Sequence, residues 1–571
     1  MQDKCFFSEC SSNICENILR FTGKGCKIVL RYTHILYHYS AHNFPKEEKF
    51  MDNNSFDPRL TPESQQPVYD PSVVPQPAQQ QAPATPRRRP PQQRSAAQRT
   101  NGSGNRRPSS ARRRRRTKMQ QFKESYLPFI LIAIAVILVL VVIFTLSSNS
   151  KKRKEAAKAS SIHAHQSEQA YFLQLDQEAA SLILEADKKA ATFDYDGAIA
   201  VLDSFSNEAR FNEFQQLVDK RNEYEEAKKA MVAWSDPSKV VHISTHHLVA
   251  EPARSFADPT YKSTIKYNFI TVDEFSRILE SLYENDFILV GMDDIVERNV
   301  NADGTVSYSP KTLYLPAGKK PIMITQTHNS PSYVFDNNGD GDPDCVSGFA
   351  SRLVITNSGQ ISCEYTDRKN NENVGNYDLI PILESFIEEH PEFSYHGARA
   401  TIAVTGRHFL FGYQTNPSIK DSKGTDYYED QVAKATEVAT KLKELGYDFA
   451  CYTYGNKRYG ELSIADIQQD LKSWKAEVEP ILGPVDTLVF AMDSDIAEPG
   501  IGYTGSKFET LTASGFSYFV GFCDSSEPWM NLYGSYVRQG RLTVFGSRLI
   551  SDPGLYEDIF DAVSAKDQNR Y

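Results

Sequence analysis

The stretch Lys320-Pro321-Ile322-Met323-Ile324-Thr325-Gln326-Thr327-His328-Asn329-Ser330 decides how the chain is interpreted. In it, a short apolar run ends abruptly in polar residues, and Ala317-Gly318 leads into the run. This pattern is typical of a buried parallel strand whose carboxyl end opens into a site. We therefore expect a functional cavity where this strand ends.

Strands and helices alternate after Lys239, which predicts a parallel sheet in an α/β domain. Apolar runs predict strands at 240–244, 286–290, 321–325, 400–405, 449–454, 487–491, 518–522 and 542–545. Helices are predicted at 271–282, 378–389, 430–445 and 464–478. Thr271 and Glu274 form a capping box for the first helix, and Gly446 ends the third. The strand count suits a barrel, in which active sites gather at the strand carboxyl ends.

Residues 1–50 show no clear structural pattern, and the composition changes at Met51. The cysteines of this segment lack the paired spacing of a zinc site; they are Cys5, Cys10, Cys15 and Cys26. We expect translation to start at Met51, so that residues 1–50 are upstream sequence read in frame. The alternative is a small metal-binding or disulfide module.

N-terminal sequencing of the purified protein tests this expectation. If Met51 is the start, the sequence reads begin at Met51 or, after removal of the methionine, at Asp52. A tryptic digest analysed by mass spectrometry then contains no peptide from residues 1–50. A peptide that carries Cys10 or Cys15 would instead favour the small cysteine-containing module.

Residues 51–125 are predicted to be a disordered Pro/Gln/Arg-rich tail in the cytoplasm. Too few large apolar residues are present to offset the chain entropy lost on folding. Residues 51–118 hold 14 Lys/Arg and 4 Asp/Glu, whereas the whole chain has a net charge of −10. Such arginine clusters bind nucleic acid or anionic lipid in some proteins. Here the adjacent apolar segment favours a topology signal, and we expect no nucleic-acid partner.

Residues 126–147 form an uncharged apolar segment, and a helix of about 22 residues is long enough to cross a hydrocarbon core of roughly 30 Å. Lys151-Lys-Arg-Lys154 follows it, but many more positive charges precede it. The positive-inside rule therefore places the N-terminus in the cytoplasm. We expect a single-pass protein of a bacterial plasma membrane, anchored in the lipid bilayer, with residues 151–571 outside the cytoplasm.

Residues 151–234 are predicted to form a helical stalk. Apolar positions recur at three- and four-residue spacing between Ala-rich and Glu/Lys-rich runs. The segment from Asp194 to Asp203 resembles the turn and second helix of one tetratricopeptide-like hairpin, but one copy is not an array. A stalk that holds the next domain off the membrane is the favoured interpretation, and a protein-docking module is the alternative.

Four phrases in the last domain carry a family resemblance: Gly348-Phe-Ala-Ser-Arg-Leu-Val, Ser394-Tyr-His-Gly-Ala-Arg-Ala-Thr-Ile-Ala-Val-Thr-Gly, Leu445-Gly-Tyr-Asp-Phe-Ala and Leu471-Lys-Ser-Trp-Lys. With the order of the elements, they resemble bacterial polysaccharide deacetylases over roughly residues 239–571. The resemblance implies a distorted (β/α) barrel that removes acetyl groups from N-acetylated sugars. It also implies a divalent metal held by one Asp and two His, with a second Asp as the base. Such a metal polarises the amide carbonyl and lowers the pKa of its bound water.

The residues at the family's chemical positions are all substituted in this chain. The family's first motif is Thr-Phe-Asp-Asp-Gly; here Thr327 stands at the base position and His328 at the metal-binding position. Tyr452 and Asn456 occupy the two histidine places of the His-Thr/Ser-x-x-His motif. Asp524 stands where the acid of a fourth motif is expected, but no Leu-x-His follows it.

These substitutions weaken metal-dependent chemistry. Threonine is no base near neutral pH, and asparagine is a weak ligand for a zinc-like ion. Residues 489–493 also lack the Pro and Gly of the family's Arg/Tyr-Pro-Tyr-Gly loop. Rival ligand sets exist around two strands: His242, His246 and His247, and His396 with His408. We expect no resident cofactor, and a divalent metal only if the chain is an active enzyme.

A second candidate metal site follows the first motif. Its possible calcium ligands are Asp336, Asn338, Asp340, Asp342 and Asp344. The first three, with Gly341, match the opening of a calcium loop, but Ser347 replaces the bidentate Glu at its twelfth position. The alternatives are an incomplete calcium loop outside the cell and a polar turn.

The cysteines of the last domain allow two interpretations. Cys345 and Cys363 could pair if the domain is exported, because oxidation is then permitted. Unpaired buried cysteines are the alternative. No residue near Cys451 offers an obvious base, so we do not expect it to be a nucleophile.

Three functions follow from these patterns. The first is a membrane-anchored, catalytically impaired deacetylase-like protein that binds cell-wall polysaccharide or a partner. Aromatic residues expected to be exposed at the barrel mouth would suit sugar faces: Tyr333, Tyr413, Tyr452, Tyr454 and Trp529. The second is an active hydrolase with altered ligands. The third is a structural envelope protein that assembles complexes through its helical stalk.

Overall fold

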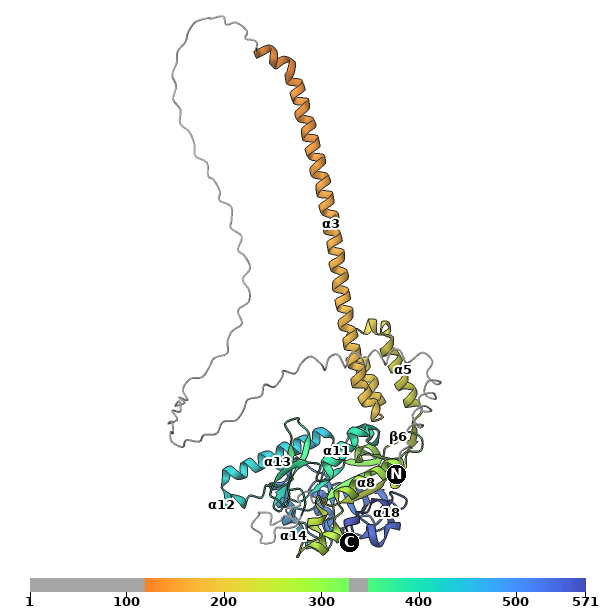
Figure 1. The fold of residues 1–571 in the computed structure, drawn as a ribbon. Helices are drawn as coiled ribbons and strands as arrows, with labels where there is room; N and C mark the ends of the chain where they lie inside the picture. Colours follow the sequence, from red (N-terminus) through yellow and green to blue (C-terminus); the bar gives the residue numbers. More distant parts are fainter. Residues whose placement is uncertain (1–118, 328–347, 571) are drawn as a thin grey trace, which may run out of the picture. The chain divides into compact units, whose positions relative to one another are not determined.

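The computed structural model of the chain describes residues 119–327 and 348–570. The chain divides at residue 116, and the second unit, residues 117–571, is compact. Every described element belongs to the second unit and is coloured by its position along the chain in Figure 1. Residues 1–118, which include the predicted N-terminal extension and most of the predicted cytoplasmic tail, lie outside the described residues. For residues 119–125 the prediction of disorder is wrong, because they form the start of α3, continuous with the apolar segment.

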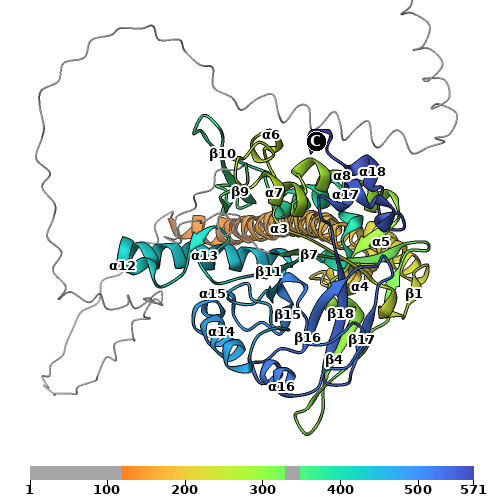
Figure 2. The same ribbon diagram turned by 90° about the horizontal axis from the view of Figure 1, so that it is seen from below.

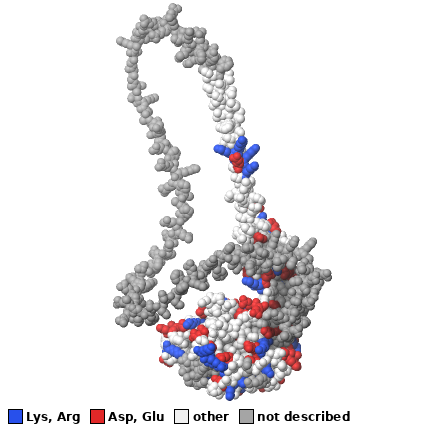
Figure 3. Space-filling view, viewed as in Figure 1, with Lys and Arg blue, Asp and Glu red and all other residues white. Residues whose placement is uncertain are grey.

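The first element is α3 (Met119–Ala191), a helix of 73 residues that joins the predicted apolar segment to the start of the predicted stalk. Among the described helices, it is the one long and apolar enough to be a membrane span. Its large apolar side chains from Ile130 to Leu146 are 48–76% exposed. Figure 3 shows this uncharged surface, followed by a cluster of charged side chains. The helical prediction for both segments is confirmed.

The end of α3 packs on a small helical hairpin. The hairpin consists of α4 (Tyr195–Asp203), the 3-10 turn η1 (Glu208–Glu213) and α5 (Gln215–Lys229). Asp194 caps α4, because its Oδ1 accepts a hydrogen bond of 2.8 Å from the Gly197 backbone nitrogen. Apolar residues spaced along all three helices form a separate core that includes Leu175, Leu202 and Leu217. We call α4, η1, α5 and the adjoining end of α3 the helical hairpin.

Seven parallel strands then close into a barrel. In ring order they are β2 (Val241–Thr245), β7 (Lys320–Thr327), β11 (Thr401–Val404), β14 (Asp448–Cys451), β15 (Thr487–Val489), β16 (Tyr518–Cys523) and β18 (Val537–Thr543). The pairing of β18 with β2 and that of β11 with β7 complete the ring. Neighbouring strands of this ring are visible in Figure 2. The predicted α/β barrel is therefore confirmed, and β7 is the strand predicted at 321–325.

Shorter strands attach to the ring or form small sheets of their own. β3 (Phe287–Leu289) pairs with the N-terminal part of β7, and β17 (Met530–Leu532) runs antiparallel to β18. The small sheets are β1 (Val232–Trp234) with β6 (Leu313–Leu315), β4 (Val296–Val300) with β5 (Val306–Pro310), β8 (Arg352–Ile355) with β9 (Ile361–Thr366) and β10 (Glu372–Gly375), and β12 (Phe409–Leu410) with β13 (Tyr413–Gln414).

Helices connect the strands and cover the barrel. The longer ones are α8 (Val272–Glu284), α11 (Leu379–Glu389), α13 (Thr425–Leu445), α14 (Ile464–Glu477) and α16 (Ser506–Ala513). Short helices are α6 (Pro252–Ser255), α7 (Lys262–Asn268), α9 (Met292–Ile295), α12 (Ile419–Lys423), α15 (Glu479–Leu482), α17 (Arg548–Ser551) and α18 (Ala562–Ala565). The 3-10 turns are η2 (Pro237–Lys239), η3 (Pro391–Phe393), η4 (Tyr395–Gly397), η5 (Ala491–Asp493), η6 (Pro553–Tyr556) and η7 (Gln568–Arg570). The capping box at Thr271 and the left-handed stop at Gly446 (φ 97°) are confirmed.

Alternation along the strands separates two packing layers. Residues such as Ile402, Leu488 and Phe519 belong to the large core shared with the surrounding helices. Their neighbours form a second cluster in the barrel interior: Ala403, Ala450, Tyr452, Val489, Ala491 and Val520. Three of these six residues are alanines, so the interior near the carboxyl ends of the strands has room for long polar side chains. We call those carboxyl ends the barrel mouth.

Three strand predictions have wrong bounds. The strands predicted at 449–454 and 487–491 end early, at Cys451 and Val489, where the mouth loops begin, and the largest shift is at β18. The sequence predicts a strand at 542–545, whereas β18 covers Val537–Thr543 and contains two arginines. Both arginines are buried, and each reaches an aspartate: Arg538 lies 2.8 Å from Asp495, and Arg541 lies 3.4 Å from Asp493. Charged residues argue against a buried strand in a sequence, but distant partners make their burial tolerable here.

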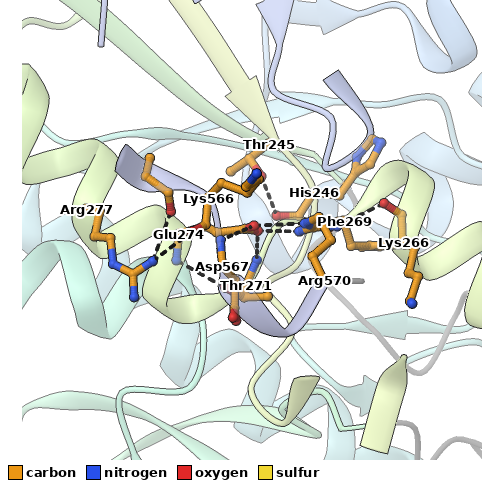
Figure 4. A network of polar contacts seen from close by, with 11 residues as sticks. Thr245, His246, Lys266, Phe269, Thr271, Glu274, Arg277, Lys566, Asp567 and Arg570 are labelled. Carbon is orange, nitrogen blue, oxygen red and sulfur yellow. Dashed lines mark hydrogen bonds and ion pairs between the residues drawn. The ribbon is translucent and has the colours of Figure 1, made fainter. Parts of the chain in front are cut away.

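The C-terminal end of the chain is fixed by a buried ion pair, which Figure 4 shows. Arg570 and Glu274 are both fully buried and in direct contact. Arg570 also donates to the backbone oxygens of Lys266 and Phe269, each at 2.9 Å. The Oε2 of Glu274 accepts from the Thr271 nitrogen, so the carboxylate that caps α8 also holds the last turn of the chain. The network therefore joins residues almost 300 positions apart.

Substitution of Arg570 by Met is expected to destabilise the barrel by about 3–5 kcal/mol, because Glu274 would be left buried and without its cationic partner. Urea unfolding followed by tryptophan fluorescence measures this change, since all three tryptophans lie at or after residue 234. The matched control is Lys434→Met, which breaks the exposed i,i+4 pair of Lys434 with Asp430 (2.7 Å). That change should cost less than about 0.5 kcal/mol. Equal effects of the two substitutions would contradict the assignment.

Candidate functional site

A buried guanidinium occupies the barrel interior just below the mouth. Arg541, on β18, is 1% exposed. It donates to the Thr543 hydroxyl (2.6 Å) and to the Phe490 carbonyl oxygen (3.1 Å), and it lies 3.4 Å from both the Ser244 hydroxyl and Asp493 Oδ1. These partners come from three strands or their exits, β2, β15 and β18. Among the described residues, Asp493 is the carboxylate within ion-pair distance of Arg541.

Tyr452 packs beside this guanidinium, where the sequence places a family metal ligand. Its ring centre is 6.0 Å from Arg541 Cζ, and its hydroxyl accepts a hydrogen bond of 3.2 Å from the Met492 backbone nitrogen. Burial raises the pKa of the Tyr452 hydroxyl. The phenol is therefore neutral at physiological pH, which makes it a poor ligand for a divalent metal.

Two threonines near the carboxyl end of β7 contact two histidines, one within β2 and one directly after it. Thr327 is completely buried, and its hydroxyl lies 2.6 Å from His246 Nδ1. His242, four residues before His246 and within β2, lies between Thr325 (2.7 Å) and Gln539 (2.9 Å). Burial, with a further contribution from Arg541, lowers the pKa of each histidine to about 3. Both imidazoles are therefore neutral hydrogen-bonding groups at physiological pH.

Asp378 joins β2 and β7 at the mouth. Its Oδ1 accepts hydrogen bonds from the Leu248 nitrogen, the Gln326 side-chain amide and the Leu379 nitrogen, all at 2.9–3.0 Å. Its Oδ2 lies 3.2 Å from His247 Nδ1. All three histidines near β2 thus have structural partners on neighbouring elements, and Nε2 of His247 is buried with no hydrogen-bond partner in the described part of the chain.

Asn456 lies in the loop that follows β14, and a buried aspartate holds this loop. Asp470, on α14, accepts from the Tyr454 nitrogen (2.8 Å), the Gly455 nitrogen (3.0 Å) and the Tyr459 hydroxyl (2.8 Å). These bonds maintain left-handed backbone at Thr453 (φ 59°) and Asn456 (φ 51°). Each such non-glycine residue costs on the order of 1–3 kcal/mol, which the surrounding contacts must offset.

The second mouth loop is left-handed as well. Met492 (φ 49°) and Asp493 (φ 56°) follow β15 and reach Tyr452 and Arg541. Four left-handed non-glycine residues therefore lie in the two loops that follow β14 and β15. Strained backbone that several contacts hold in place is typical of functional sites.

The described donor set does not fit a divalent metal. Tyr452 is neutral, and its hydroxyl is bonded to the backbone. Asn456 Oδ1 is buried and has no hydrogen-bond partner among the described residues, but an amide oxygen alone is a weak ligand. No group of three His, Cys, Asp or Glu side chains in residues 119–327 and 348–570 is arranged to hold a metal ion. In addition, the cationic Arg541 would repel a cation placed next to Tyr452.

Asp524 does not join this arrangement. It follows β16, its side chain is 66% exposed, and it forms an ion pair with Arg548. His396 is also remote, because it belongs to η4, ahead of the first residue of β11. His408 follows β11 on the mouth side and is partly buried near Phe409.

Several aromatic residues expected to be exposed at the mouth are instead packed. Tyr413 is 5% exposed and donates to the Leu353 carbonyl oxygen (2.9 Å), and Tyr452 is 2% exposed. Tyr454 donates to Glu477. Trp529 packs against Gly540, where an added Cβ would lie 2.2 Å from the indole nitrogen. For Tyr413 and Tyr452, the predicted exposure is wrong, because Tyr413 packs into the large core and Tyr452 fills the space beside the interior alanines.

Cys363, Cys451 and Cys523 are buried, and no disulfide joins any two of these three described cysteines. Burial raises the pKa of the Cys451 and Cys363 thiols well above the usual range, so neither is a reactive thiolate. Other predicted residues lie outside the described residues: His328, Tyr333, Asp336, Asn338, Asp340, Asp342, Asp344 and Cys345. The calcium loop and a Cys345–Cys363 pair therefore stay predictions.

Comparisons with known proteins give little for this chain. No family model matches it, and no curated protein matches it. Among solved structures, it is similar to the Streptococcus pyogenes deacetylase PplD in complex with acetate, with 11% sequence identity and a TM-score of 0.28. That match covers 57% of this chain and 99% of the other. At this TM-score the likeness carries no argument about chemistry, and the fold is defined by the strand pairings themselves.

The sequence pointed to β7 and to Tyr452 but not to Arg541, Asp470 or Asp378. The sequence contains a signal for Arg541, because the polar residues Gln539, Arg541 and Thr543 occupy every second position and alternate with Gly540 and Leu542. Polar residues at every second position of a central strand indicate a polar interior. No local pattern in the sequence identifies Asp470, because it lies on α14 and contacts the loop after β14 only once the chain is folded.

His242 is expected to make the fold sensitive to acid. Its folded-state pKa of about 3 lies below the value of 6.5 for an ordinary histidine. The stability that the neutral ring contributes is therefore complete above about pH 6.5 and is lost as the pH falls toward 3. The loss has a slope of up to about 1.4 kcal/mol per pH unit, because the unfolded chain binds the proton first.

Urea unfolding at pH 7, 6, 5 and 4 measures this slope in the wild type and in His242→Asn. The variant should be less stable at pH 7, because it loses packing, but its stability should fall less steeply with acid. His163→Asn, at an exposed position on α3, controls for loss of a histidine elsewhere. Identical slopes in all three proteins would show that His242 is not the acid-sensitive group.

Proposed function

We propose that this chain is a membrane-anchored protein of the bacterial cell envelope whose deacetylase-like barrel binds cell-wall glycan without metal-dependent hydrolysis. In this proposal α3 crosses the plasma membrane once, the N-terminus is cytoplasmic and the barrel is extracytoplasmic. The exposed apolar surface of α3 from Ile130 to Leu146 supports the anchor. The excess of positive charge before the span supports the orientation.

The main observation in favour of an absent metal-dependent activity is the position of Arg541 next to Tyr452. A metal-dependent deacetylase needs ligands that attract a divalent cation, and a base near its bound water. Here the interior below the mouth holds a guanidinium, which is itself a fixed positive charge. Its neighbours are hydroxyls, a carbonyl oxygen and one carboxylate, and those groups already accept its hydrogen bonds.

The residues at the position of the expected base also support a binding role without hydrolysis. Thr327 has no acidic proton near neutral pH, and its hydroxyl is occupied by His246. His246 has a pKa of about 3 through burial and Arg541, so it is a weak proton acceptor at pH 7. The described mouth residues therefore lack a group that could deprotonate a water molecule at useful rates.

The loops at the barrel mouth are held in fixed conformations, and this supports a binding role. Asp378, Asp470 and Tyr452 each fix a loop through hydrogen bonds to backbone nitrogens. Loops held in one conformation lose little entropy on binding a ligand. A binding protein needs this pre-organisation as much as an enzyme does.

Two tests together separate binding from catalysis. The full-length protein, held in lipid nanodiscs, should contain far less than one bound transition-metal ion per chain by inductively coupled plasma mass spectrometry, whatever its calcium content. It should release no acetate from penta-N-acetylchitopentaose, even with Zn²⁺, Co²⁺ or Ni²⁺ added. Acetate release that a chelator abolishes would overturn the proposal and favour an active N-deacetylase with altered ligands.

Co-sedimentation with purified cell-wall polysaccharide tests the binding half of the proposal. The protein in nanodiscs should be retained, and empty nanodiscs should not. Absence of retention would favour the other candidate, a structural protein that assembles envelope complexes through protein contacts of the helical hairpin.

A further inference from the structure

A groove of about 720 Å³ lies between the helical hairpin and the end of the barrel opposite the mouth. Its barrel side is formed by Tyr314 of β6 and by Tyr395 and His396 of η4, which precede β7 and β11 along the chain. Its other side is formed by Phe193 and Tyr195, at the start of α4, and by the end of α5. The volume is in the range of about 300–1,000 Å³ that is typical of ligand sites.

Aromatic rings dominate the groove, and some of them are open to solvent. Tyr314 is 52% exposed, and His396 is exposed as well. The rings of Tyr395 and His396 stack with their centres 3.9 Å apart and their planes at 12°. Tyr395 itself is only 7% exposed and supports the ring of His396, so His396 and Tyr314 present the flat apolar surfaces that are open to a ligand.

The backbone at His396 is held in a strained conformation. His396 has left-handed φ and ψ angles of 51° and 23°, which are uncommon outside glycine. Its nitrogen donates a hydrogen bond of 2.8 Å to the Thr192 oxygen at the end of α3. This contact joins η4 to the helical hairpin and sets the position of the imidazole in the groove. Strain of this kind is a reason to suspect a functional role.

The charged residues of the groove are balanced. Asp196 and Glu225 carry negative charge, while Lys228 and Lys229 carry positive charge, and Lys228 pairs with Asp196 across the gap between α4 and α5. The lining therefore has no net charge from these four groups. A strongly anionic or cationic ligand gains nothing from such a lining, whereas a neutral ligand with many hydroxyl groups can exchange hydrogen bonds with its charged edge.

We propose that this groove is a second glycan site, which holds a neutral oligosaccharide against the exposed rings of Tyr314 and His396, with the buried ring of Tyr395 supporting His396. Pyranose rings have apolar C–H faces that pack on aromatic rings and hydroxyl edges that bond to carboxylates and ammonium groups, as do other ligands with one apolar and one polar side. The inference rests on the proposed function for the class of ligand, but its location is independent of the barrel mouth. A bound oligosaccharide would contact both the helical hairpin and the barrel.

Saturation-transfer NMR with penta-N-acetylchitopentaose tests the site in the full-length protein. The protein is held in lipid nanodiscs free of glycolipid, because glycoside detergents would compete as sugars. Tyr314→Ala removes an exposed ring, and His396→Gly removes a ring at a position where glycine is the favoured residue. Each variant should weaken binding at least tenfold. Tyr171→Ala, at a 44% exposed tyrosine of α3 outside the groove, is the matched control and should leave binding unchanged.

Three results would overturn the groove assignment. One is no saturation transfer to the wild-type protein. Another is binding that survives both groove substitutions, in which case retention on cell-wall polysaccharide would still support the mouth as the glycan site. The last is an equal signal from a neutral Gly-Ser peptide of similar size, which would indicate a peptide site instead.

Discussion

The buried guanidinium of Arg541 is the interaction on which the arrangement of the barrel mouth depends. A charged group inside a barrel must be compensated, because transfer of an unpaired ion from water costs several kcal/mol or more. Ser244, Thr543, the Phe490 carbonyl and Asp493 supply that compensation from three sides. The left-handed turn at Met492 and Asp493 brings the carboxylate into reach, and the interior alanines leave the room that the side chain needs.

The same interaction determines what chemistry the mouth can perform. A fixed positive charge lies beside Tyr452, and it lowers the pKa of His242 and His246 beyond the effect of burial. The described part of the mouth thus combines strained, well-anchored loops with buried histidines that are weak proton acceptors. Binding is a function that this combination still permits, and the aromatic groove at the other end of the barrel is suited to the same class of ligand.

Much of the fold was predictable because its signals are local. Apolar runs marked the ring strands, and the capping box at Thr271 and the glycine at 446 marked helix ends. β18 was misplaced because Arg538 and Arg541 do not look like core residues until Asp495 and Asp493 are placed beside them. The candidate site was predictable only in part: Thr327 and Tyr452 lie at the mouth, but Tyr413 proved buried, and Asp524 points to Arg548.

The apolar span within α3, the parallel α/β alternation, and the lack of a carboxylate at position 327 and of histidines at positions 452 and 456 can all be recognised before folding is considered. These features follow from residue type and short-range periodicity, which any window of the chain displays. The partners of the buried charged and polar groups, in contrast, become known only when the chain is folded. His242 meets Gln539 across 297 positions, and Arg570 meets Glu274 across 296. The first contact arises from closure of the barrel ring, and the second from packing of the last turn of the chain on α8. No local pattern specifies which distant segments will be adjacent.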